Sequence, residues 1–159
     1  MLSFTLLGRT VLSKNGVPLA QFRSQKEAAL LIYLAQTGQA HQRDFLATLL
    51  WESSSTKQSL TNLRTTLSRL RKQVGDALLI TRNSVTLTLE NRQQVDSVIL
   101  LQTLADGGQT DSAEKATTLQ NALATYHGDF LTDYHLSNAP AFNEWAMVTR
   151  EHIRRQVIA

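Results

Sequence analysis

The chain of 159 residues contains no cysteine, so it can form neither a disulfide framework nor a thiolate metal site. It has only two prolines and seven glycines, too few for long disordered linkers. No apolar run approaches the roughly 20 residues that span a bilayer, and the first residues lack the basic and apolar regions of a signal peptide. These absences predict a globular, cytoplasmic protein without a membrane partner.

Groups that support catalysis or cofactor binding are also scarce. The four histidines form no HExxH pattern, and no glycine belongs to a GxxxxGK[ST] loop. His127, Gly128 and Asp129 bring an imidazole near a carboxylate but have no activated nucleophile, so we interpret them as a helix end with Gly128 in left-handed geometry. We therefore predict no catalytic residue, no metal site and no cofactor, which disfavours a hydrolase or nuclease.

Charge is divided unevenly along the chain, although the net charge is only +3. Residues 1–90 hold eleven basic and five acidic side chains, whereas residues 91–159 hold five basic and eight acidic ones. A basic half joined to an acidic half indicates two domains with different partners. We place them at residues 1–92 and 93–159, and expect the first to face nucleic acid and the second to face protein.

The basic half begins with a β-rich segment and two helices. Asn15-Gly16 predicts a tight hairpin turn, because both positions of a type I′ turn need positive φ. Ser24 and Glu27 have capping-box spacing, and Gly38 suits the end of the helix that follows. A second helix over residues 43–51 has an apolar side and ends at Trp51, which we expect in the core. The inward residues predicted for the two helices are Leu30, Leu31, Leu34, Phe45, Leu46, Leu49 and Leu50.

Residues 57–74 form the most informative segment, with five basic side chains and no acidic one. Its apolar residues recur at spacings of three and four, which predicts one buried stripe of a helix: Leu60, Leu63, Leu67, Leu70 and Val74. The other side carries Gln58, Thr61, Asn62, Arg64, Thr65, Ser68, Arg69, Arg71 and Lys72. Such side chains bind base edges and phosphates. Of the basic residues, Arg71 is expected nearest the core and is therefore a candidate for pairing within the protein.

After Gly75 the periodicity changes from helical to alternating. Residues 79–81 and 85–89 predict a second hairpin around Arg82-Asn83-Ser84, whose tip is basic and polar. A sheet, two helices, a basic helix and a closing hairpin are the order of a winged helix-turn-helix. The fold class is therefore α+β: a winged helix-turn-helix with an N-terminal β-sheet and a C-terminal hairpin wing, followed by an all-α segment.

Residues 95–159 read as three helices. The first ends at Gly107-Gly108, the second begins at Asp111-Ser112 and closes at Gly128, and the third begins at Pro140. The second is expected to turn Ala116, Leu119, Leu123 and Tyr126 inward, and the third Phe142, Trp145, Val148, His152 or Ile153, and Val157. Helical hairpins of this kind usually stack on further copies. We therefore expect an N-terminal fragment of a longer protein, with no receiver domain before the winged helix.

Several segments together resemble a known family. LLGRTVLSKNGVPL, RDFLATLLW, SLTNLRTTLSRLRKQVG and ALATYHGDFL look like the antibiotic-regulatory-protein (SARP) type of bacterial transcriptional activators. These have an OmpR-like winged helix and a tetratricopeptide-like bacterial transcriptional activator domain. The resemblance implies an activator that binds direct-repeat promoter sites and contacts RNA polymerase, and it allows a homodimer on DNA.

In that family the third helix enters the major groove and the hairpin tip follows the minor groove. The resemblance therefore implies double-stranded DNA as the partner. The DNA-binding residues would be Thr61, Asn62, Arg64, Thr65, Ser68, Arg69 and Lys72, with Arg82 and Asn83 in the wing. Candidate phosphate contacts are Lys26, Arg43, Lys57 and Arg71. The alternative is a protein-interaction module whose basic helix docks on an acidic protein.

Overall fold

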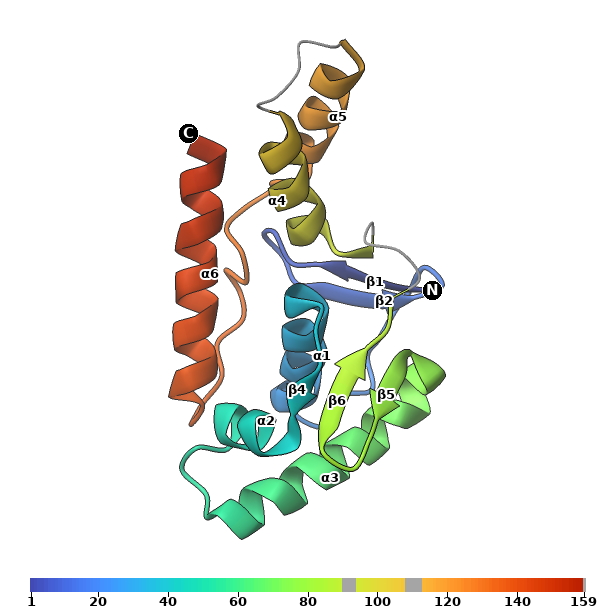
Figure 1. Cartoon of the computed structure of the whole chain (residues 1–159), viewed down its shortest axis with the longest axis vertical. Helices are drawn as coiled ribbons and strands as arrows, with labels where there is room; N and C mark the ends of the chain where they lie inside the picture. The colour runs from blue at the N-terminus through green and yellow to red at the C-terminus, as the bar shows by residue number, and fades with distance from the viewer. Residues whose placement is uncertain (90–93, 108–112, 159) are drawn as a thin grey trace.

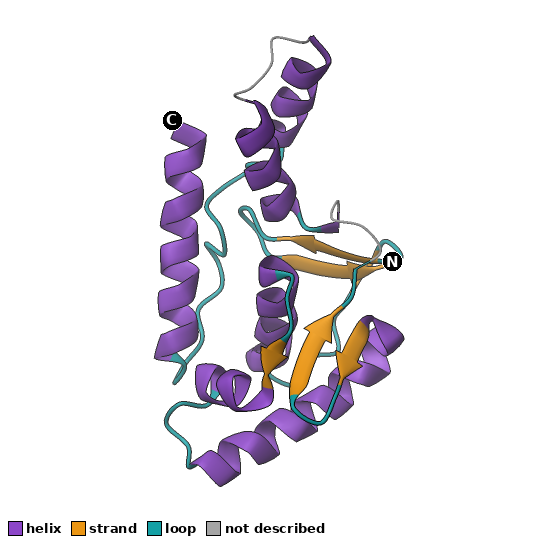
Figure 2. Cartoon of the chain, in the orientation of Figure 1, coloured by secondary structure: helices purple, strands orange, loops and turns teal. Residues whose placement is uncertain are grey.

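The computed structural model describes residues 1–89, 94–107 and 113–158. Its elements follow the predicted order, with strands confined to the N-terminal half and helices filling the C-terminal half (Figures 1 and 2). In chain order they are β1 (Leu2–Thr5), β2 (Val11–Lys14), β3 (Val17–Pro18), α1 (Gln25–Thr37), β4 (His41–Gln42), α2 (Arg43–Leu50), α3 (Thr56–Val74), the 3-10 helix η1 (Gly75–Ala77), β5 (Leu78–Ile80), β6 (Ser84–Leu87), α4 (Asp96–Gly107), α5 (Ala113–Ala124) and α6 (Pro140–Ile158).

The N-terminal sheet is antiparallel and has the order β1-β2-β3. The predicted turn between β2 and β3 is confirmed, because Asn15 has φ 53° and Gly16 has φ 82°. Both residues therefore adopt the positive φ that this turn requires. β1 buries Leu2 and Phe4 on the side that faces the helices, so this sheet closes one end of the core.

The second sheet has the order β4-β6-β5 and forms the wing. Its hairpin is confirmed: Leu78 pairs with Leu87 and Ile80 pairs with Val85. β4 was not predicted, because a strand of two residues is too short to show a period. By pairing His41 with Val85, β4 fastens the hairpin to the start of α2.

Helix α1 runs through the middle of the core and is buried from residue 27 to residue 35. Its predicted end is confirmed, since Gly38 has φ 66° and its N–H donates to the carbonyl of Leu34 at 3.0 Å. The predicted capping box is wrong. The Ser24 hydroxyl caps nothing, and the Glu27 carboxylate accepts from the backbone N–H of Arg23 at 3.1 Å instead. The Glu27 carboxylate is buried beside α3, where its second oxygen pairs with the Arg69 side chain.

Helices α2 and α3 pack on α1 and complete the helical part of the winged fold. α2 buries Leu46, Leu49 and Leu50, but the prediction that Phe45 lies inward is wrong, because Phe45 is 48% exposed. α3 buries the predicted stripe except Leu60, which is only half-buried at the edge of the packed face. The long apolar stripe therefore holds α3 against the core and turns its polar side outward. Figure 1 shows α3 at the outer edge of the molecule, beside the hairpin of β5 and β6.

The C-terminal helices differ from the prediction in detail. α5 buries only Ala122 and ends at Ala124, so Gly128 does not close it. Ala116 is exposed, while Leu119, Leu123 and Tyr126 are half-buried. Gly128 lacks the predicted positive φ. There is no room for a side chain at this position because the backbone of Gly8 crosses it, and an added Cβ would lie 2.9 Å from the Gly8 Cα. The predicted cap at residues 111–112 lies outside the described residues.

Helix α6 buries Phe142 and Ile153 and half-buries Trp145, as predicted. The expectation for Val148 is wrong, since its side chain is 60% exposed. Between the two candidates at the next turn, Ile153 is inward and His152 is exposed. Among the described helices, none has the length and apolarity needed to cross a membrane.

The segment before α6 is attached to the end of the N-terminal sheet. Gly8 N–H donates to the Asp129 carbonyl at 3.0 Å, and Leu131 N–H donates to the Leu6 carbonyl at 2.9 Å. Asp96, at the start of α4, accepts from the N–H groups of Leu6 and Leu7 at 2.8 and 3.2 Å. One cluster of buried apolar residues runs from β1 through α1 to α6. The helical segment therefore lies on the winged fold, while the division into domains at residue 92 stays a prediction.

Candidate nucleic-acid interface

The outward side of α3 carries most of the residues that the sequence nominates. Thr61, Arg64, Thr65, Ser68 and Lys72 are exposed, and Asn62 is half-buried. Lys57 and Arg71, the two candidate phosphate contacts on this helix, are exposed as well. Because the described residues of α3 include no acidic side chain, no carboxylate within the helix itself neutralises this positive charge.

Hydrogen bonds within α3 determine what several of these side chains can offer to a partner. The Thr61 hydroxyl donates to the Lys57 carbonyl at 3.0 Å, and the Thr65 hydroxyl donates to the Thr61 carbonyl at 3.1 Å. A threonine hydroxyl has one hydrogen, so both can still accept a hydrogen bond and present a methyl group. Asn62 accepts from the Gln58 amide at 2.8 Å, which leaves its own amide hydrogens available.

Arg69 is the basic residue of α3 that pairs within the protein. Its Nη1 lies 3.2 Å from Oε1 of Glu27, whose side chain is 1% exposed. The expectation that Arg71 is the arginine nearest the core is therefore wrong, because Arg71 is exposed and Arg69 is half-buried. Helical spacing places Arg71 near the edge of the apolar stripe and Arg69 on the polar side, but the buried carboxylate on α1 pairs with Arg69.

The wing tip is exposed at Arg82 and Asn83, both nominated from the sequence. Arg43 holds this tip to the start of α2 in two ways. Its backbone N–H donates to the Asn83 carbonyl at 2.9 Å, and its guanidinium Nη1 donates to the Thr81 carbonyl at 3.3 Å. Arg43 is thus partly occupied by the protein, and the hairpin turn has a defined position relative to α2.

A cleft of about 570 Å³ lies where α2, α3 and the wing meet. It brings together three of the nominated arginines, Arg43, Arg64 and Arg82, from three separate elements. Its lining residues are Gln42, Arg43, Asp44, Leu60, Arg64, Arg82 and Asn83. Figure 1 shows the hairpin turn beside the middle of α3, with α2 next to them. Gln42 and Asp44 were not nominated, because nothing in a linear pattern places the end of β4 and the start of α2 beside α3. Leu60 was expected in the buried stripe of α3.

Lys26, the remaining candidate phosphate contact, is half-buried away from this cleft. Its Nζ lies 5.6 Å from the centre of the Trp51 ring, a cation–π geometry. Burial lowers the pKa of Lys26 below its ordinary value. Because Lys26 lies in the first turn of α1 and Trp51 at the end of α2, this contact links the two helices and covers part of the Trp51 ring.

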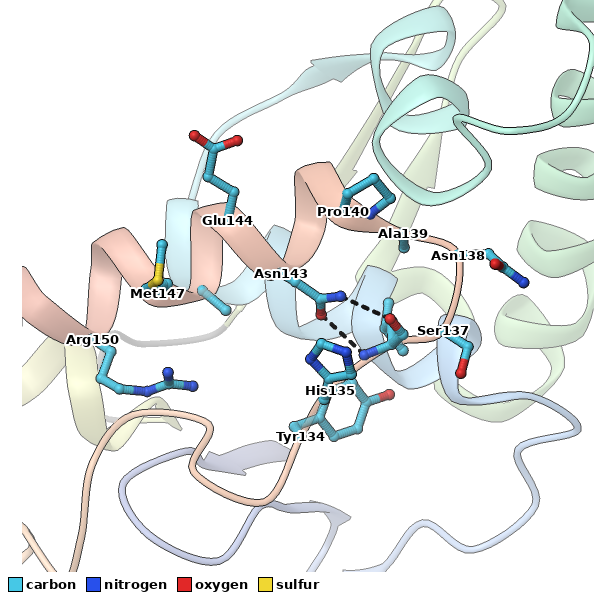
Figure 3. Close-up of a pocket in the computed structure, with 12 residues that line it drawn as sticks. Tyr134, His135, Ser137, Asn138, Ala139, Pro140, Asn143, Glu144, Met147 and Arg150 are labelled. Atoms are coloured by element: carbon cyan, nitrogen blue, oxygen red, sulfur yellow. Dashed lines mark hydrogen bonds between the residues drawn. The ribbon is translucent and has the colours of Figure 1, made fainter.

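A second cavity, of about 560 Å³, lies on the C-terminal segment and includes none of the nominated residues. It is lined by residues of the loop before α6 and of α6 itself (Figure 3). Asn143 stabilises this loop, because its side chain accepts from Leu136 N–H at 3.0 Å and donates to the Leu136 carbonyl at 2.7 Å. Within the described parts of the chain, no group of three or more histidine, aspartate or glutamate residues could hold a metal ion.

The fold is α+β, with two small antiparallel sheets and, among the described residues, six α-helices. A search of solved structures finds a similar fold in EmbR of Mycobacterium tuberculosis, which was solved in complex with a low-affinity phosphopeptide. The TM-score is 0.76 and the sequence identity is 22%. The match covers 98% of this chain and 43% of EmbR, so the chain spans less than half of that protein's length. At this identity the likeness shows the fold. No protein-family model and no curated protein matches the sequence.

Proposed function

We propose that this chain is a transcriptional regulator that binds double-stranded DNA in a sequence-specific manner. The observation that carries the proposal is the combination of an exposed α3 surface without acidic residues and a cleft that joins this surface to the arginine of the wing. Positive charge on the element that a winged helix inserts into the major groove is the electrostatic footprint of DNA binding. The family resemblance of the sequence and the likeness of the fold to EmbR support the same conclusion.

In this proposal α3 lies in the major groove and the hairpin wing follows the adjacent minor groove. Asn62 has amide hydrogens available and reads adenine. Thr61 and Thr65 use their hydroxyl hydrogens within the helix, so they read bases as acceptors or through contact with a thymine methyl group. Lys57, Arg71 and Lys72 are exposed at the margins of this surface and neutralise phosphates.

The helical segment that follows is proposed to carry the activator role. The family resemblance implies contact with RNA polymerase, direct-repeat sites, a cytoplasmic location and a homodimer on DNA. The tetratricopeptide-like character of α4 to α6 belongs to the same proposal. Its support is the packing of α4 against α5 and of α6 against α4.

Selection from a random duplex library tests the proposal. The whole chain should enrich one motif, and its affinity should fall as salt rises. Five exposed cations on α3 and the wing predict a slope of log K against log salt of about −4 to −5, at −0.9 per phosphate contact. Asn62→Ala should relax the preference at one base pair, whereas Lys72→Gln should weaken all duplexes alike.

The alternative function, docking on an acidic protein, predicts a different result in the same experiment. In that case duplexes would bind weakly, without an enriched motif, and Asn62→Ala would change nothing. An enriched motif that shifts with Asn62→Ala therefore separates the two functions.

A further inference from the structure

We propose that the cleft between α2, α3 and the wing seats the sugar-phosphate backbone of one DNA strand, with Arg64 and Arg82 as its phosphate ligands. The inference rests on the proposed function and assigns a ligand to one part of the surface. A helix in the major groove and a wing in the next minor groove lie on either side of a single backbone. Whatever lies between α3 and the hairpin turn must therefore accommodate that backbone.

The chemistry of the cleft suits a phosphodiester. Arg64 comes from α3 and Arg82 from the wing, and both are exposed. Neither side chain forms an ion pair or a hydrogen bond with another part of the described chain, so both guanidinium groups are available to phosphate oxygens. Half-buried Leu60 supplies an apolar wall against which a deoxyribose can pack.

Arg43 acts here as a positioning residue. It holds the carbonyls of Thr81 and Asn83, the two residues that flank Arg82. The separation between Arg82 and α3 is therefore set before DNA arrives, and less ordering is needed on binding. This arrangement explains why an arginine at the first position of α2 lies in the cleft while part of its hydrogen-bonding capacity is already used.

The seat also assigns Arg64 one of the two roles that an arginine on α3 could have, contact with a phosphate or with a base. An arginine that faces the wing across the backbone contacts phosphate and does not read guanine. Base discrimination then falls to the other exposed residues of α3. Asp44 lines the same cleft and opposes a phosphate there, so its carboxylate is expected to weaken DNA binding.

A scan of single methylphosphonates along the selected duplex tests the seat, because each removes the charge of one phosphate. For the unmodified chain we expect a loss of about tenfold at one phosphate or two adjacent ones. Arg64→Gln and Arg82→Gln should each bind about tenfold more weakly and lose their sensitivity at those same positions. Arg64→Gln should keep the preferred motif. Arg43→Gln removes the side-chain bond to Thr81 and keeps the backbone bond to Asn83, so it should reduce the sensitivity that depends on Arg82 and preserve the one that depends on Arg64, a split that general unfolding would not produce.

A second variant gives a gain instead of a loss. Asp44→Asn should raise affinity several-fold for all duplexes, whereas the matched control Asp76→Asn, on η1 outside the cleft, should leave it unchanged. The seat is refuted if Arg64 and Arg82 couple to phosphates on opposite strands, if Arg64→Gln shifts the motif, or if Asp44→Asn has no effect. Failure of the unmodified chain to enrich any motif would instead refute the proposed function, and the seat with it.

Discussion

Arg69 on α3 and Glu27 on α1 form an ion pair of 3.2 Å between residues 42 positions apart in the chain. The carboxylate is buried, while the arginine side chain is 40% exposed. The other oxygen of Glu27 accepts from the backbone N–H of Arg23, so both of its oxygens are used. This pair adds a charged contact between α3 and the central helix to the apolar stripe that turns the polar side of α3 outward.

Removing the arginine should destabilise the fold. Arg69→Met leaves a buried carboxylate without its charged partner and should lower the free energy of unfolding by about 1–3 kcal/mol. The double variant Glu27→Gln with Arg69→Gln should recover most of this loss, because two amides can hydrogen-bond without a buried charge. Arg71→Met is the control, since Arg71 is exposed and its loss should cost less than about 0.5 kcal/mol. Thermal and urea unfolding measure all three; equal costs for Arg69 and Arg71 would contradict the prediction.

The same double variant tests whether Arg69 contributes to DNA binding. If Arg69 serves Glu27 and not a base, the variant that replaces both by glutamine should bind the selected duplex within about threefold of the original chain. Asn62→Ala, the comparison, should lose about tenfold or more. Fluorescence anisotropy at one fixed salt concentration measures both. A loss in the double variant as large as that of Asn62→Ala would restore Arg69 to the list of base-reading residues.

The crossing of Gly8 and Gly128 should tolerate no side chain. In Gly128→Ala the new Cβ would lie 2.9 Å from the Gly8 Cα, and backbone cannot move aside as a flexible side chain can. We expect a loss of about 1–3 kcal/mol in unfolding free energy. Gly16→Asn is the control, because nothing lies within 4 Å of an added Cβ there and asparagine suits the turn. A neutral Gly128→Ala would mean that the two segments can separate without cost.

His41 should make the fold sensitive to mild acid. Burial lowers the pKa of its imidazole below 6.5, and its Nε2 lies 2.8 Å from the Thr37 hydroxyl. The unfolded chain therefore binds a proton more readily than the folded one. The contribution of His41 to stability is complete above pH 6.5 and decreases as the pH falls toward the lowered pKa of the folded state.

Melting temperatures between about pH 5 and pH 7 check this prediction. His41→Gln should reduce the loss on acidification, whereas His152→Gln, an exposed position on α6, should not. A titration of the His41 ring by NMR with a midpoint at or above 6.5 would contradict the expected direction.

Periodicity predicted most of the elements because each of them is a local property. The stripe of leucines in α3, the alternation in the wing and Asn15-Gly16 in the first turn all follow from side-chain spacing or allowed φ. The same reasoning failed for Phe45 and Val148. Each has the spacing of a buried residue, but Val148 is 60% exposed and Phe45 is 48% exposed, although the Phe45 ring lies against those of His41 and Tyr33.

The candidate DNA-binding surface divides in the same way. The residues that α3 contributes to this surface could be predicted, because they lie on the side of the helix opposite its apolar stripe. The ion pair of Glu27, the cleft that includes Asp44 and Leu60, and the anchoring of the wing by Arg43 join residues from different elements. No spacing within one segment contains such information.

The sequence by itself determined that a helix without acidic residues would expose its polar side between two helices and a hairpin, since hydrophobic periodicity and charge are properties of neighbouring residues. The tertiary structure alone decided which of its arginines are available. The buried carboxylate of Glu27 engages Arg69 because an unpaired charge in the core is costly, while Arg64 forms no ion pair within the described parts of the chain and lines the same cleft as Arg82. Packing of α1 against α3 thus divides chemically identical side chains into one that positions the helix and one that is available to bind.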